Sequence, residues 1–179
     1  MTPMPLMNVN RSRLVIIDFQ ARLMPAIHDG PRLVANAARL VAAAKLLEVP
    51  IVMTEQNPAG LGATVPELAD AAPAIAKMSF DSCGAPDFID AIAGDEDLIL
   101  CGCEAHVCVG QTALSLLENK RRVLVVQDAV GSRAPESKEV ALRRLERNGA
   151  EIVTTEMVVF EWLRTAEHPQ FRATAKLIK

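Results

Sequence analysis

Short apolar runs rich in β-branched residues alternate in this chain with Ala- and Leu-rich segments of helical period, and this alternation constrains the fold most. The runs lie at residues 14–17, 50–54, 97–101, 122–126 and 151–154. The segments with helical period lie at residues 31–48, 85–93, 107–119 and 136–148, with two short ones at the C-terminal end. Strands that are short and continuously apolar are buried on both faces, and right-handed crossovers place helices on both sides of their sheet. The pattern therefore predicts a three-layer α/β/α sandwich with a mainly parallel, five- or six-stranded sheet.

The chain length and composition predict one folded unit. A length of 179 residues is typical of one domain, and no linker or internal repeat interrupts the pattern. Hydrophobic residues make up 50% and charged residues 23%, which excludes a disordered chain. We therefore expect a single domain over residues 1–179.

Charge and composition exclude several classes of partner. Nineteen basic and 22 acidic side chains leave a net charge of −3, and the chain contains one Trp, five Phe and no Tyr. A nucleic-acid-binding protein usually carries a basic patch and aromatic side chains that stack on bases, so we expect no nucleic-acid partner. The longest apolar stretch, residues 33–47, is interrupted by Asn36, Arg39 and Lys45, so we expect no membrane partner.

The compartment is expected to be the cytoplasm. The N-terminal segment MTPMPLMNVNRSR lacks the basic and then apolar pattern of a signal peptide. The four cysteines, at positions 83, 101, 103 and 108, are too few and too clustered for a secreted disulfide scaffold. We interpret them as reduced thiols.

Polar residues follow the predicted strands at the sheet edge where active sites of parallel α/β proteins lie. They are the segments at residues 18–20, 55–57 and 102–108, and Asp128. The densest of these segments is the turn from Gly102 to Cys108, which joins a predicted strand to a predicted helix. A thiol at a helix N-terminus feels the helix dipole, so we expect a lowered pKa at Cys108. Cys101 and Cys103 instead fit the alternative interpretation, that of small buried side chains.

A zinc site built on the cysteine turn is the other chemical interpretation of this cluster. Structural zinc sites take paired ligands from two separate segments. Cys101 and Cys103 flank a single glycine, Cys83 stands alone, and His28 and His168 are isolated. We therefore predict no metal site.

Three motifs together resemble the isochorismatase-like cysteine hydrolase superfamily. They are LVIIDFQ, which contains Asp18, AKMSFDS, which contains Lys77, and GCEAHVCVGQTA, which contains Cys108. The similarity spans nearly the whole chain, and the cysteine motif is the most specific of the three. The EAHVC turn, the TEQNPAGLG loop and the C-terminal HPQF and KLIK segments look most like the isochorismatase domain-containing subgroup.

The resemblance implies a role for each matching residue. Cys108 would be the nucleophile, Asp18 the general base, and Lys77, in a mid-chain loop, the cation that holds the Asp18 carboxylate. A cis peptide bond would join Cys103 to Glu104, and the backbone N–H groups of Glu104 and Cys108 would form the oxyanion hole. From the residue pattern alone, Asp18 is equally a helix cap and Lys77 is a solvated surface lysine.

Departures from the family pattern narrow the expected activity. Metal-dependent nicotinamidases of this superfamily carry an Asp/His cluster after the second strand, where this chain has residues 54–58, TEQNP. We therefore expect no metal and no cofactor. Isochorismatases proper need no cysteine nucleophile, so the presence of Cys108 favours hydrolysis of a small amide or related carbonyl compound. The alternatives are a catalytically silent binding or scaffolding protein with this fold and, more weakly, a thiol-redox protein in which Cys103 resolves a disulfide.

Side chains at the strand ends are also candidates for binding a small-molecule substrate. On position alone these are Phe19, Gln20, Gln56 and His106. The mean hydropathy of +0.20 is high for a small monomer, because excess apolar surface is usually buried by a partner. We therefore expect a homo-oligomer, either a dimer or a tetramer, as the resemblance also implies.

Overall fold

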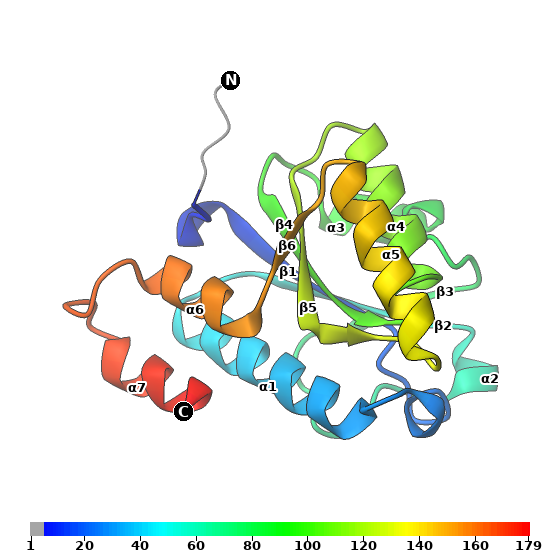
Figure 1. Cartoon of the computed structure of the whole chain (residues 1–179), viewed down its shortest axis with the longest axis horizontal. Helices are drawn as coiled ribbons and strands as arrows, with labels where there is room; N and C mark the ends of the chain where they lie inside the picture. Colours follow the sequence, from blue (N-terminus) through cyan, green and yellow to red (C-terminus); the bar gives the residue numbers. More distant parts are fainter. Residues whose placement is uncertain (1–5) are drawn as a thin grey trace.

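The computed structural model describes residues 6–179, and its centre is a six-stranded sheet (Figure 1). The first five residues of the N-terminal segment analysed above for a targeting signal lie outside the described residues. Every strand pairing is parallel, and the strand order is β3-β2-β1-β4-β5-β6. The strands are β1 (Ser12–Ile17), β2 (Ile51–Gln56), β3 (Ala74–Lys77), β4 (Asp97–Cys103), β5 (Val123–Gly131) and β6 (Glu151–Val153).

Helices cover both faces of the sheet. In Figure 1, α1, α6 and α7 lie on one side of the strands, and α3, α4 and α5 lie on the other. The helices are α1 (Gly30–Leu46), α2 (Pro58–Leu61), α3 (Pro86–Ala91), α4 (Cys108–Glu118), α5 (Pro135–Arg147), α6 (Thr155–Leu163) and α7 (Phe171–Ala175). Short 3-10 turns are η1 (Val9–Arg11), η2 (Met24–Ala26), η3 (Ser82–Gly84) and η4 (Lys176–Ile178). Within residues 6–179, none of these helices is long and apolar enough to cross a bilayer.

The central strands are apolar throughout because both of their faces are buried. In β1, Leu14 and Ile16 pack in the core layer beneath α1 and α6, whereas Val15 and Ile17 pack in the layer beneath α4. All four side chains are fully buried. This packing confirms the predicted three-layer sandwich with a parallel sheet.

The edge strand β3 is the one strand of residues 6–179 that the periodicity did not predict. Its four residues, Ala74–Lys77, alternate between exposed and half-buried positions until the buried Lys77. A short edge strand needs no apolar run, because only one neighbouring strand pairs with it. The expectation that Lys77 lies in a loop is therefore wrong, since this residue ends a strand paired with β2.

The strand order reverses between β1 and β4, and this reversal creates the crevice in which the candidate site lies. The chain builds β2 and β3 outward on one side of β1, and then returns to place β4 on the other side. In parallel α/β sheets, such a switch point opens a crevice beyond the carboxyl ends of the two strands. Gly102 in β4 has φ +141°, and a Cβ atom there would lie 2.0 Å from the Ile17 carbonyl oxygen. A glycine at this position therefore allows the two strands to approach each other directly below the crevice.

Candidate active site

A buried ion pair lies at the carboxyl edge of the sheet. Asp18 follows β1 and Lys77 ends β3, and the Lys77 Nζ atom is 2.9 Å from the Asp18 Oδ2 atom. The lysine and aspartate side chains are only 0% and 1% exposed. Both charged groups are buried. A buried ion pair lowers the stability of a fold unless further hydrogen bonds satisfy the remaining donors of the lysine and the remaining lone pairs of the carboxylate.

Both members of the ion pair are held by additional hydrogen bonds. Lys77 Nζ also donates to the backbone carbonyls of Ser79 and Phe80, each at 3.0 Å. The Thr54 hydroxyl, from β2, donates to the Asp18 Oδ1 atom at 2.8 Å. With these bonds, the lysine uses three donors and each carboxylate oxygen accepts at least one hydrogen bond. The Asp18 carboxylate is therefore fixed in position by two separate strands.

Cys108 is the first residue of α4, and its thiol is buried beside Asp18. The pKa of this thiol is raised to about 12, chiefly by burial and then by the negative charge of Asp18 and its hydrogen bond to the thiol. The positive charge of Lys77 acts in the opposite direction and lowers the pKa, but by less than burial or the Asp18 charge raises it. The expectation of a lowered thiol pKa from the helix dipole is therefore wrong for the resting protein. At neutral pH, the proton therefore stays on the Cys108 sulfur.

The turn before Cys108 is fixed by contacts with the end of β5. The peptide bond between Cys103 and Glu104 is cis. Ala105 N donates to the Gly131 carbonyl at 2.7 Å, and the Glu104 carboxylate accepts from both Arg133 N and Arg133 Nε, at 2.8 and 3.1 Å. Among residues 6–179, the backbone N–H groups of Glu104 and Cys108 donate to no protein acceptor. These two donors are thus left available to a bound molecule.

Phe19 and Gln20, two of the sequence-predicted pocket residues, are both fully buried. Phe19 lies in the core layer beneath α1. The Gln20 amide nitrogen donates to the carbonyls of Gln56 and Gly62, and its oxygen accepts from Gln56 N. Gln20 therefore supports the loop after β2, whereas a role in contacting substrate stays a prediction for both residues.

Gln56 and His106 lie nearer to solvent. The Gln56 side chain donates to the Met78 carbonyl at 2.8 Å, next to the loop that binds Lys77. The exposed His106 places Nδ1 at 2.8 Å from the Ser132 hydroxyl. A role in the substrate pocket stays a prediction for both side chains.

Sequence reasoning missed Thr54 and the backbone of Ser79 and Phe80 as parts of the site. Thr54 carries a weak signal, since it is a hydroxyl side chain near the carboxyl end of an apolar strand. The two carbonyls carry none, because any residue type supplies a carbonyl.

The fold and the site together define a three-layer parallel α/β protein with a cysteine, an aspartate and a lysine gathered at its topological switch point. The family model described as the isochorismatase domain matches residues 12–157. The chain belongs to this isochorismatase family.

Curated relatives and solved structures agree with this assignment. Isochorismatase domain-containing protein 2A of Mus musculus is 40% identical over 170 residues, which cover 94% of this chain and 82% of the relative. A structure described as the MAR1 ribonuclease of Caenorhabditis elegans superposes with a TM-score of 0.92 at 36% identity, covering 97% of this chain and 92% of the other. The Escherichia coli YcaC gene product, described as an octameric hydrolase of unknown specificity, superposes with a TM-score of 0.90 at 26% identity, covering 99% and 91%.

Proposed function

We propose that this chain is a hydrolase that uses the Cys108 thiol to attack a small amide or a related carbonyl compound. The observation that carries the proposal is the placement of a buried thiol beside Asp18, whose carboxylate is fixed by Lys77 and Thr54. A nucleophile, an adjacent base and a group that orients the base are the parts that nucleophilic catalysis requires.

In the first half of the reaction, Asp18 takes the thiol proton and the sulfur attacks the carbonyl carbon. The carbonyl oxygen becomes an oxyanion, which the free N–H groups of Glu104 and Cys108 stabilise. When the tetrahedral intermediate collapses, the C–N bond breaks and the proton held by Asp18 passes to the leaving nitrogen. The products of this half are a thioester on Cys108 and a released amine or ammonia.

In the second half, water hydrolyses the thioester. Asp18, again a carboxylate, removes a proton from the water as its oxygen attacks the thioester carbon. The intermediate collapses, the C–S bond breaks, and the Asp18 proton returns to the sulfur. The acid product leaves, and the site regains its resting thiol and carboxylate.

Lys77 supplies a fixed positive charge that favours the thiolate during the attack. Its charge lowers the pKa of Cys108, in opposition to burial and to Asp18. Because Lys77 donates to Asp18 and to two carbonyls, it occupies one position throughout and needs no rearrangement when the thiolate forms.

A panel of small amides tests the proposal. The purified chain is incubated with primary amides of aliphatic and aromatic acids and with N-carbamoyl compounds, and released ammonia is measured. Cys108→Ala is expected to lower the rate by at least about 1000-fold for any accepted amide, because the nucleophile is lost. Cys83→Ala is the matched control and is expected to keep the activity, because the Cys83 thiol on η3 interacts with Asp81 and not with Asp18 or Lys77. Turnover that survives Cys108→Ala would reject the mechanism.

RNA hydrolysis and simple binding are the competing functions. The C. elegans neighbour is described as a ribonuclease, so RNA belongs in the panel as a substrate. The net charge of −3 disfavours RNA for this chain, because phosphate backbones are bound by excess basic charge. If no amide is hydrolysed but a small molecule binds, the silent binding protein becomes the better interpretation.

We also propose that the chain works as a homo-oligomer in the cytoplasm. All four thiols are free, as expected in a reducing compartment. The E. coli relative described as an octameric hydrolase supports self-association.

A further inference from the structure

A cavity whose lining does not include Cys108 lies between β5 and the first turns of α1 and α5. Its volume is about 350 Å³, which falls within the range of small-molecule sites. His28 and Arg32 line it on one side, Asp128 and Ser132 on another, and Lys138 on a third. Asp18, Lys77 and Cys108 do not contribute to its lining, although Ser132 in its wall contacts His106 of the cysteine turn.

The cavity lies where β5 departs from the register of β4, at residues 126–129, although Val126 still pairs with Val153 of β6. Leu100 of β4 pairs with Val125, but Gly102, two residues later, pairs with Val130. The additional residues of β5 therefore bulge outward, and Gln127 and Asp128 are the two residues of this strand that are not buried. Bulges of this kind re-aim side chains and are frequent near functional sites.

Asp128 is a rigidly held carboxylate in the cavity wall. Its Oδ1 atom accepts from Thr155 N and from the Thr155 hydroxyl, at 2.8 and 2.9 Å. Its backbone carbonyl accepts from the Asn36 side chain. Both donors to the carboxylate are neutral, so its negative charge is not neutralised by them.

Lys138 is a half-buried cation that also faces this cavity. Among residues 6–179, it forms no ion pair and no side-chain hydrogen bond. Burial lowers its pKa, the nearby Arg32 charge lowers it further, and the negative charges of Asp128 and Asp29 oppose this. Arg32 itself pairs only loosely with Asp29, at 3.6 Å. Besides Arg32 and Asp29, which also line the cavity, it holds a fixed carboxylate and an ammonium that interact without forming an ion pair.

We propose that this cavity binds a small zwitterion of the amino-acid class, with its ammonium group at Asp128 and its carboxylate at Lys138. Two opposite charges that are held apart across a cavity match a ligand carrying both complementary charges. A ligand with one charge would satisfy only one of them and leave the other half-buried charge without a partner. His28 and Arg32 line the same cavity and can add donors to the ligand carboxylate.

Calorimetric titration with five probes tests the proposal. Glycine, β-alanine and γ-aminobutyrate carry both charges at increasing separation, whereas acetate and ethylammonium carry one charge each. At least one zwitterion is expected to bind saturably, and at least 10-fold more tightly than either single-charge probe. Lys138→Met and Asp128→Asn are each expected to weaken that binding at least 10-fold. Asn at position 128 keeps an oxygen for Thr155, so the local fold is retained.

Lys45→Met is the matched control, because Lys45 lies exposed near the opposite end of α1, and it is expected to leave binding unchanged. Cys108→Ala is also expected to bind the zwitterion normally, which separates this proposal from the proposed hydrolase activity. The proposal is overturned if no zwitterion binds, if acetate binds as tightly, or if Lys138→Met binds with unchanged affinity. Melting temperatures of all variants verify that each is folded.

Discussion

At the scale of single residues, the Asp18 carboxylate connects every part of the candidate site. One oxygen is bound by the Thr54 hydroxyl and the other by Lys77. The same carboxylate raises the pKa of Cys108 and is the base that would remove its proton. Asp18 therefore stabilises the resting thiol and, in the proposed mechanism, is also the group that would make this thiol a nucleophile.

Asp18→Asn is expected to separate these two effects. Hydrolysis falls at least about 100-fold because the general base is lost. Alkylation of Cys108 by iodoacetamide at about pH 8 becomes faster, because the charge that raised the thiol pKa is removed while Lys77 remains. Mass spectrometry of the modified peptide measures this rate. A slower or unchanged alkylation rate would contradict the assigned electrostatics.

Lys77→Met is expected to act in the opposite direction on the thiol. Loss of the ammonium removes the positive charge that lowers the Cys108 pKa, so alkylation slows and hydrolysis is also lost. The buried Asp18 charge then lacks its partner, which costs on the order of 3 kcal/mol of stability. Alkylation rates and urea unfolding measure the two effects. Faster alkylation in this variant would exclude Lys77 as the group that favours the thiolate.

At the scale of elements, the contact between β1 and β4 sets the position of the site. Asp18 follows one of these strands, and the cysteine turn follows the other. The close approach of the two strands depends on Gly102, whose missing Cβ leaves room for the Ile17 carbonyl. A side chain at position 102 would therefore move Asp18 relative to Cys108.

Gly102→Ala is expected to destabilise the protein by about 3 kcal/mol or more. The new methyl group would clash with the Ile17 carbonyl of β1, and alanine is also strained at a positive φ, so the two costs add. Gly149→Ala is the matched control. Gly149 also has a positive φ, +101°, but the nearest atom to the position that a methyl group would take there is 3.9 Å away. This variant therefore carries only the conformational cost of about 1–2 kcal/mol. Urea unfolding measures the free energy of unfolding of both variants. If the two variants lose the same amount, the close packing of β4 against β1 does not explain the effect of Gly102→Ala.

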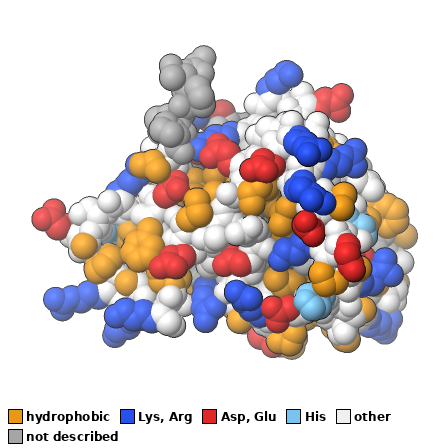
Figure 2. Space-filling model, viewed as in Figure 1, with side chains coloured by type: hydrophobic (Ala, Val, Ile, Leu, Met, Phe, Trp, Pro, Cys, Tyr) orange, Lys and Arg blue, Asp and Glu red, His pale blue; other side chains and the backbone are white. Residues whose placement is uncertain are grey.

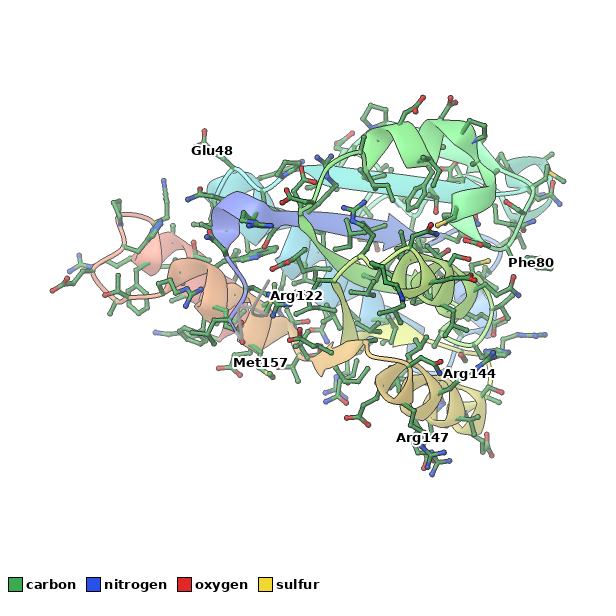
Figure 3. The ribbon with its side chains drawn as sticks, turned by 90° about the horizontal axis from the view of Figure 1, so that it is seen from above. Glu48, Phe80, Arg122, Arg144, Arg147 and Met157 are labelled. Carbon is green, nitrogen blue, oxygen red and sulfur yellow. The ribbon has the colours of Figure 1, made fainter. Side chains whose placement is uncertain are left out.

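At the scale of the whole molecule, several large apolar side chains remain exposed, and two pairs of them lie close together in the chain. Met78 and Phe80, on the loop that binds Lys77, are 71% and 52% exposed, and Figure 3 shows Phe80 at the rim of the molecule. Met157 and Phe160 of α6 are each 44% exposed. Acidic and basic side chains are interspersed over the face shown in Figure 2, with apolar side chains between them. These apolar surfaces are the regions that a second copy would cover.

Light scattering after size exclusion is expected to give a mass of two or four copies of the 19.3 kDa chain. Phe80→Ser is expected to lower the association if the loop after β3 lies in the contact. Glu48, an exposed residue at the other end of the molecule in Figure 3, offers the control Glu48→Ser. A single species of one-chain mass at micromolar concentration would exclude the homo-oligomer.

Stability is expected to fall at alkaline pH because buried thiols resist ionisation in the folded chain. Burial raises the pKa of Cys101 from 9.0 to about 12, so the unfolded chain loses this proton first. The contribution of this thiol to stability is complete below pH 9 and is lost as the pH rises toward 12. Cys101→Val is expected to reduce the pH slope by up to about 1.4 kcal/mol per pH unit. Urea unfolding at about pH 8 and about pH 10.5 with a reductant measures the slope, and an unchanged slope contradicts this origin.

The sequence predicted the parts of this protein that depend on local pattern. Continuous apolar runs identified the five strands other than β3, and their carboxyl ends identified Asp18 and the Cys108 turn. Lys77 came only from the family resemblance, because the edge strand that carries it has no apolar periodicity.

The layered α/β fold and the sheet edge that carries the polar residues were thus determined by the sequence alone, because periodicity and strand ends are properties of neighbouring residues. Only the tertiary structure decided the state of the site. The protonation of Cys108 depends on how deeply it is buried and on charges at the ends of β1 and β3, which lie far earlier in the chain. Desolvation and Coulomb interactions act through space, so no local pattern encodes them.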